Sequence, residues 1–111
     1  MVNKGGGVHV ISKKPFNQAA RANPNQKRAL EAVYRVLRKG NFDSPDRLKC
    51  AFPSLDKFKH RAKWWVIDIG GNHLRMIAFI QFTQNRLYVK HIVSHKEYDR
   101  LCWRYQKGEL K

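Results

Sequence analysis

The stretch that decides the fold runs from residue 64 to residue 93 and reads WWVIDIGGNHLRMIAFIQFTQNRLYVKHIV. Its runs of apolar and β-branched residues predict strands at Trp64–Ile69, Leu74–Phe82 and Arg86–Val93. Between them, Gly70-Gly71 and Gln84-Asn85 are typical of hairpin turns. Strands joined by such short turns pair antiparallel, so the stretch predicts an antiparallel meander.

The middle strand is amphipathic in the way expected of a sheet with one buried face. Successive side chains of a strand point to opposite faces. One face is wholly apolar and comprises Leu74, Met76, Ala78, Ile80 and Phe82. The other face is partly polar and comprises His73, Arg75, Ile77, Phe79 and Gln81. We therefore expect helices to pack on one face of the sheet.

Helices are predicted before the meander. One follows Pro15 and ends near Asn23, and another begins at Asn23-Pro24, with Asn23 as the N-cap, and ends at Gly40. The second carries an apolar stripe at helical spacing, made of Leu30, Val33, Tyr34 and Leu37.

A further helix is predicted after the meander. Ser94 and Glu97 form a capping box that starts it. Residues 8–12 predict a short strand, and residues 41–56 are irregular, with one helical turn at 46–50. The order β-α-α-β-β-β-α is that of a single α+β domain over residues 8–111, after a flexible glycine-rich lead at 1–7.

The charge of the chain points to a polyanionic partner. The 111 residues carry 23 Lys and Arg against 8 Asp and Glu, a formal net charge of +15. No apolar run approaches the ~18 residues of a membrane span, and no secretory leader is evident, so we expect a cytoplasmic protein without a membrane partner. With only Cys50 and Cys102 and scattered histidines, the chain predicts no metal site and no cofactor.

A basic and aromatic set remains as the candidate site. Lys57, Lys59, Arg61 and Lys63 precede the first meander strand, and Arg75 begins the second on its less apolar face. His95 and Tyr98 share a face of the last helix, and strand order predicts that Arg75 lies near His95. Such groups can cleave RNA by transferring protons and stabilising a charged phosphorane.

Structural explanations compete for several of these residues. Lys57 to Lys63 also fits a solvated basic loop, Arg75 a salt bridge to Asp68, and Tyr98 a core position. His91 alternates with Val89 and Val93, which favours a structural role. Trp64 and Trp65 point to opposite sheet faces, so one is expected in the core and the other can stack on a base.

Three motifs in this order resemble the HigB toxins, bacterial members of the RelE/ParE superfamily. They are Phe52-Pro53-Ser54-Leu55-Asp56-Lys57-Phe58-Lys59, Gly70-Gly71-Asn72-His73-Leu74-Arg75 and Ser94-His95-Lys96-Glu97-Tyr98-Asp99. The resemblance covers about residues 8 to 105 and implies a RelE-like fold. It also implies a ribosome-dependent mRNA endonuclease of a type II toxin–antitoxin system, which requires no metal and is neutralised by a HigA-type helix-turn-helix antitoxin.

The resemblance also implies roles for individual residues. The catalytic candidates are His95, Tyr98, Arg75, Lys57 and Lys59, and the RNA-binding candidates are Arg61, Lys63, His60, His73 and Lys96. The general base stays open among His60, His73, His95 and a lysine. Two other functions also stay open, a non-catalytic RNA- or DNA-binding protein and a gyrase inhibitor of the same fold, because fold alone does not establish activity.

Overall fold

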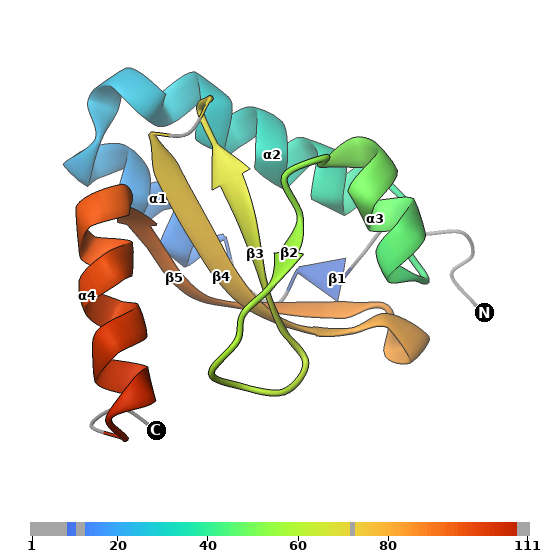
Figure 1. Ribbon diagram of the computed structural model, residues 1–111. Coiled ribbons are helices and arrows are strands. Elements are labelled where there is room, and N and C mark those ends of the chain that lie inside the picture. Colours follow the sequence, from blue (N-terminus) through green and yellow to red (C-terminus); the bar gives the residue numbers. More distant parts are fainter. Residues whose placement is uncertain (1–8, 11–12, 72, 109–111) are drawn as a thin grey trace.

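The computed structural model describes residues 9–10, 13–71 and 73–108. The predicted lead at 1–7 lies outside these residues, as do most of the first predicted strand and the last three residues. Within the described part, the chain forms an α+β domain around a five-stranded sheet of order β1-β5-β4-β3-β2 (Figure 1). The predicted fold class is confirmed.

The central meander forms as predicted. It comprises β3 (Trp64–Ile69), β4 (Leu74–Gln81) and β5 (Arg86–Ser94), which pair antiparallel. Gly70 and Gly71 take positive φ values of 66° and 61°, which explains glycine at this turn. The second turn is a short 3₁₀ helix, η2 (Phe82–Gln84), followed by Asn85 in the left-handed region. The short β1 (His9–Val10) pairs parallel to β5 at one edge.

The predicted helices are present, although two of their ends differ from expectation. They are α1 (Lys14–Ala22), the 3₁₀ turn η1 (Pro24–Gln26), α2 (Lys27–Lys39) and α4 (His95–Gln106). Asn23 does not cap the following helix, since its side-chain amide donates back to the Ala19 carbonyl (3.0 Å). Gly40 ends α2 in an extended conformation, not a left-handed one. Ser94 does cap α4, because its hydroxyl accepts a hydrogen bond from the Glu97 N–H (3.3 Å).

The segment predicted as irregular contains more structure than its sequence indicates. The single helical turn expected at 46–50 is α3 (Pro45–Ala51), capped by Ser44. Next comes the two-residue strand β2 (Asp56–Lys57), which pairs with β3 and forms the other sheet edge. Two residues are too few to show an alternating pattern in the sequence. They form a strand only because they pair with β3.

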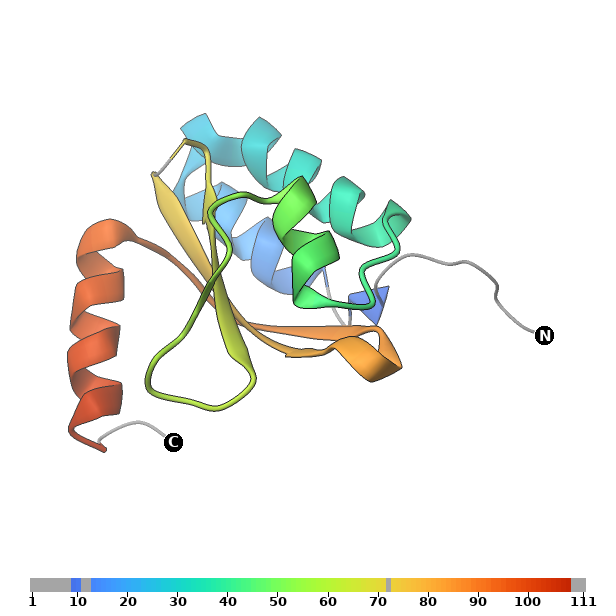
Figure 2. The same ribbon diagram turned by 45° about the vertical axis from the view of Figure 1, so that its right-hand side comes forward.

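Helices cover both faces of the sheet, which corrects the prediction of a single covered face. The larger core joins α1, α2 and α3 to Leu74, Met76, Ala78 and Ile80 of β4. On the opposite face, α4 covers Val66 and Ile77 through Tyr105, and Figure 2 shows α4 apart from the other helices. Ile77 is fully buried there, which explains an apolar residue on the partly polar face. Trp64 and Trp65 lie on opposite faces, as predicted.

Leu37 is expected to be a principal stabilising residue of the larger core. Its side chain is fully buried, so truncation removes apolar contact and leaves a cavity. We expect Leu37→Ala to lower the free energy of unfolding by about 2–5 kcal/mol in urea denaturation followed by circular dichroism. The neighbouring Val36 is 42% exposed, and Val36→Ala should change this free energy by less than about 0.5 kcal/mol. Equal effects of the two substitutions would contradict the packing.

Candidate active site

A small pocket lies on the α4 side of the sheet and gathers part of the predicted site. We call it the Arg75 pocket; its volume is about 80 Å³, and it is lined by Ser54, Asp56, Lys57, Val66, Asp68, Arg75 and Tyr98. These residues come from β2, β3, β4, α4 and, for Ser54, the segment before β2. The pocket therefore forms between the sheet and α4, the last helix.

Arg75 is held between a carboxylate and an aromatic ring. It pairs with Asp68 across β3 and β4, and its Nε lies 3.2 Å from Asp68 Oδ1. Its Cζ lies 4.5 Å from the centre of the Tyr98 ring, within cation–π distance. The salt bridge considered from the sequence is thus present. A guanidinium has five N–H donors and Arg75 is 29% exposed, so one ion pair does not exhaust its capacity to bind an anion.

The surroundings of Tyr98 keep its hydroxyl protonated. Burial raises the pKa of its hydroxyl to about 12, and Cys102 adds to this rise. The charge of Arg75 acts in the opposite direction but does not reverse the shift. Tyr98 therefore remains protonated throughout the neutral range, with its ring half-buried against the α4-side core.

The two residues of β2 lie on opposite faces of the sheet. Asp56 pairs with Val66, and Lys57 pairs with Trp65. Directly paired residues share a face, so Asp56 belongs with Val66 on the Arg75 side and Lys57 belongs with Trp65 on the other. Lys57 still borders the Arg75 pocket, because β2 is the edge strand.

The carboxylates of the Arg75 pocket were missed as site residues by the sequence reasoning. Asp68 entered only as a salt-bridge partner, and Asp56 only as part of a motif that carries the resemblance. Asp68 is anchored further by its own N–H, which donates to Ser54 Oγ (3.0 Å). The alternation of Trp64, Val66 and Asp68 on β3 places Asp68 on the Arg75 side, but the position of Asp56 depends on the unpredicted strand β2.

The other predicted residues lie outside the Arg75 pocket. Lys59, Arg61 and Lys63 line a separate, larger pocket on the loop between β2 and β3. Arg61 lies over the Tyr105 ring (4.9 Å), and His60 lies edge-on to Phe58 (5.4 Å).

The remaining candidates lie near the ends of the strands. His73 is exposed in the turn before β4, and Lys96 is exposed on the first turn of α4. The sheet register places Arg75 opposite Val93, two residues before the half-exposed His95, but His95 does not line the Arg75 pocket.

His91 has the structural surroundings expected from the sequence. Its Nε2 and the Tyr105 hydroxyl are joined by a hydrogen bond of 2.8 Å. Burial, and secondarily the charge of Lys90, lowers the pKa of His91 below its ordinary value. The folded protein therefore resists binding a proton that the unfolded chain accepts.

Folding stability should consequently decrease as the pH falls below about 6.5, the ordinary pKa of histidine. We expect His91→Gln to lose less stability than the wild type between about pH 7.5 and about pH 5.5 in denaturant titrations. The exposed His73→Gln variant should retain the wild-type dependence. Identical pH dependence in all three proteins would contradict the assignment to His91.

Two other kinds of feature are absent from the described part of the chain. No three His, Cys, Asp or Glu side chains lie close enough together to hold a metal ion. No described helix combines the length and the apolar character needed to cross a bilayer.

The fold and the site define a class: a small, strongly basic α+β protein with a pocket in which Arg75 lies between Asp68 and the Tyr98 ring. The chain belongs to the HigB toxin family, since that family's sequence model, described as the RelE-like toxic component of a toxin-antitoxin system, matches residues 26–101. A toxin of such a system has an antitoxin as its partner.

Individual relatives agree with this membership. The chain is 48% identical over 102 residues to "mRNA interferase HigB" of a strain of Escherichia coli, covering 92% of this chain and 99% of that protein. It is 40% identical over 92 residues to "mRNA interferase toxin HigB" of another Escherichia coli strain and to "mRNA interferase HigB" of Shigella flexneri. These matches cover 83% of this chain and 88% of each relative.

Proposed function

We propose that this chain is an mRNA endonuclease that cuts translated messages on the ribosome and thereby arrests translation. The observation that carries the proposal is the contact of Arg75, which is 29% exposed, with the Tyr98 ring in one pocket. Family membership and the relatives' activity support the same reaction. A purely binding protein has no need for a half-buried, protonated hydroxyl beside its cation.

The proposed reaction uses the RNA's own 2′-OH as the nucleophile. The 2′ oxygen loses its proton and bonds to the adjacent phosphorus, and the bond from phosphorus to the 5′ oxygen breaks. The 5′ oxygen takes up a proton, so the products are a 2′,3′-cyclic phosphate and a 5′-OH. The reaction needs a proton acceptor, a proton donor and positive charge beside the phosphorane.

The residues of this chain supply these needs as follows. Arg75 stabilises the negative charge of the phosphorane, Tyr98 donates the proton to the 5′ oxygen, and Asp68 positions Arg75. Lys57 and Lys59 position the RNA backbone. Proton acceptance is assigned to His95, one helical turn before Tyr98, with His60 and His73 as further candidates. More distant contacts to RNA are assigned to Arg61, Lys63 and Lys96.

The proposed partners follow from the same assignment. The ribosome and its mRNA are the targets, which places the action in the cytoplasm. The antitoxin is proposed to be a HigA-type helix-turn-helix protein. With a formal charge of +15, the toxin can associate with ribosomal RNA at a rate that depends on salt.

Controlled induction in a bacterial cell tests the function. We expect growth arrest together with new 5′ ends inside translated regions, in phase with the reading frame. Arrest without such ends but with DNA damage signalling would indicate a gyrase inhibitor. RNA binding that weakens steeply with salt and yields no cut products would indicate a binding protein.

A further inference from the structure

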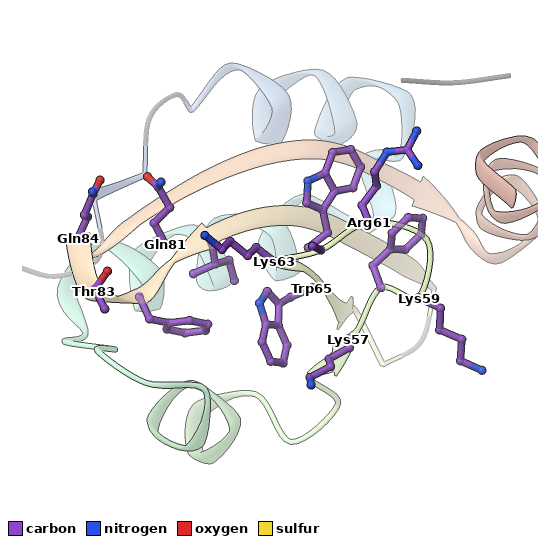
Figure 3. A pocket seen from close by; sticks show the side chains of 13 residues that line it. Lys57, Lys59, Arg61, Lys63, Trp65, Gln81, Thr83 and Gln84 are labelled. Atoms are coloured by element: carbon purple, nitrogen blue, oxygen red, sulfur yellow. The ribbon is translucent and has the colours of Figure 1, made fainter. Parts of the chain in front are cut away.

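A second, larger hollow lies along the loop between β2 and β3, and residues of both sheet faces line it. We call it the basic groove; its volume is about 1000 Å³, and it is lined by Lys57, Phe58, Lys59, Arg61, Ala62, Lys63, Trp64, Trp65, Ile80, Gln81, Phe82, Thr83 and Gln84 (Figure 3). Four of these residues are cations and none is a carboxylate. The size is at the upper end of the range for small-ligand sites. The proposed function assigns the four cations to contacts with RNA, but it gives no role to the aromatic and amide residues of the groove.

The floor of the groove offers an aromatic surface. Trp65 is half-buried, and its ring meets Phe82 edge-on, with ring centres 5.6 Å apart. Every nucleobase has a flat face that can stack on an exposed indole. Gln81 and Gln84 lie at one end of the groove, and each amide both donates and accepts hydrogen bonds, as base edges require.

Two lysines border the groove at different places. Lys57 is the direct cross-strand partner of Trp65, and Figure 3 shows its amino end beside the indole. Lys63 extends toward Gln81 (Figure 3), and its carbonyl accepts a hydrogen bond from the Ile80 N–H (3.1 Å). Lys59 and Arg61 extend outward (Figure 3). The inner cations thus border an apolar surface, where a phosphate and a base can be bound together.

The backbone at Lys63 is held in an uncommon conformation. Its φ is 64°, in the left-handed region that residues other than glycine seldom occupy. Such strain persists only when the surroundings impose it, and it concentrates at binding sites. The residue in this conformation is a cation that lines the groove.

We propose that the basic groove binds single-stranded RNA next to the cleavage site, with one base stacked on Trp65 and phosphates at Lys57 and Lys63. The proposal rests on the proposed endonuclease function. Lys57 borders both the Arg75 pocket and the groove, so one RNA strand passing over the β2 edge reaches both. This continuity favours RNA over an acidic peptide of the antitoxin, which would have no reason to follow the path to Arg75.

Binding of a non-cleavable probe tests the groove separately from catalysis. The probe is a fluorescein-labelled 2′-O-methyl oligoribonucleotide of about ten nucleotides, measured by fluorescence anisotropy over a range of salt concentrations. It lacks the 2′-OH that cleavage requires. The full chain is used in all variants, and thermal unfolding followed by circular dichroism verifies that each is folded.

This assay should distinguish base stacking on Trp65 from the phosphate contact at Lys63. Trp65→Leu should weaken binding about tenfold or more without changing the salt dependence, whereas Trp65→Phe should restore most of the affinity. Lys63→Asn should reduce the slope of log affinity against log salt by about 0.7, as expected for one lost phosphate contact to a single strand. Asparagine tolerates the left-handed backbone, so this variant should fold normally.

Trp103→Leu is the matched control, because Trp103 is 55% exposed on α4 and does not line the groove. It should bind the probe as the wild type does. Wild-type affinity in folded Trp65→Leu and an unchanged salt slope in Lys63→Asn would overturn the proposal. So would Trp65 variants that lose antitoxin binding but keep RNA binding, an outcome that would assign the groove to the antitoxin.

The cleavage assay separates this proposal from the proposed function. If the wild type arrests growth and cuts mRNA while probe binding is independent of Trp65, the groove proposal alone fails. If probe binding depends on Trp65 and Lys63 but no mRNA is cut, the endonuclease function fails and the groove remains an RNA-binding site.

Discussion

Arg75→Ala is expected to reduce mRNA cleavage about 100-fold to 1000-fold, the effect of removing one donor that stabilises a charged transition state. The measurement is single-turnover cleavage of an mRNA on programmed ribosomes. Arg75→Lys should restore only part of the rate, because an ammonium lacks the planar fork of the guanidinium. Growth arrest in cells should disappear with Arg75→Ala.

Folding should survive the same substitution. The ion pair between Arg75 and Asp68 is more than a quarter exposed on both sides, and such pairs contribute less than about 1 kcal/mol. Antitoxin binding should therefore also persist. Arg100→Ala is the matched control, since Arg100 pairs with Glu97 on the exposed side of α4. A fully toxic Arg75→Ala would remove Arg75 from the mechanism.

Tyr98→Phe is expected to reduce cleavage by about 10² to 10⁴, the typical contribution of a positioned proton donor. The substitution removes only the hydroxyl. The ring keeps its packing against Phe58 (6.3 Å between centres) and its contact with Arg75, so a loss of rate reports the missing proton and not a collapsed site. The measurement is the same single-turnover assay, together with thermal unfolding.

The pH profile provides a second test of Tyr98. Because its pKa is about 12, the hydroxyl remains a donor well above neutral pH, and the wild-type rate should show no decline between about pH 8 and about pH 10 through loss of this proton. Tyr105→Phe is the control, since its hydroxyl contacts His91 and does not line the Arg75 pocket. Equal rates for Tyr98→Phe and the wild type would exclude Tyr98 as the donor.

Much of the fold could be read from local patterns. Alternation on β4 predicts which residues enter the larger core, and Leu30 and Leu37 confirm the stripe on α2. The capping box at Ser94 predicts where α4 begins. These features can be predicted because each depends on residues that are close in sequence. They are the alternation along a strand, the spacing along a helix and a cap three residues away.

The candidate site was harder to predict from the sequence than the fold. Arg75 and Tyr98 were singled out and do meet, but Asp56 was missed and the basic run was treated as one unit. The run divides because β2 pairs with β3 and because Lys59 and Arg61 lie on the loop beyond it. No local sequence pattern predicts the pairing of β2 with β3 or the separation of Lys57 from Lys59 and Arg61.

The sequence by itself determined the α+β class, the meander, the basic character and the resemblance that leads to the HigB toxin family. Only the tertiary structure decided that α4 covers the second face of the sheet, that Asp68 and Tyr98 hold Arg75 between them, and that Lys57 stands between two pockets. The physical reason is the range of the interactions. Periodicity and capping act within a few residues, whereas the pockets form from side chains of separate strands and helices that only packing brings together.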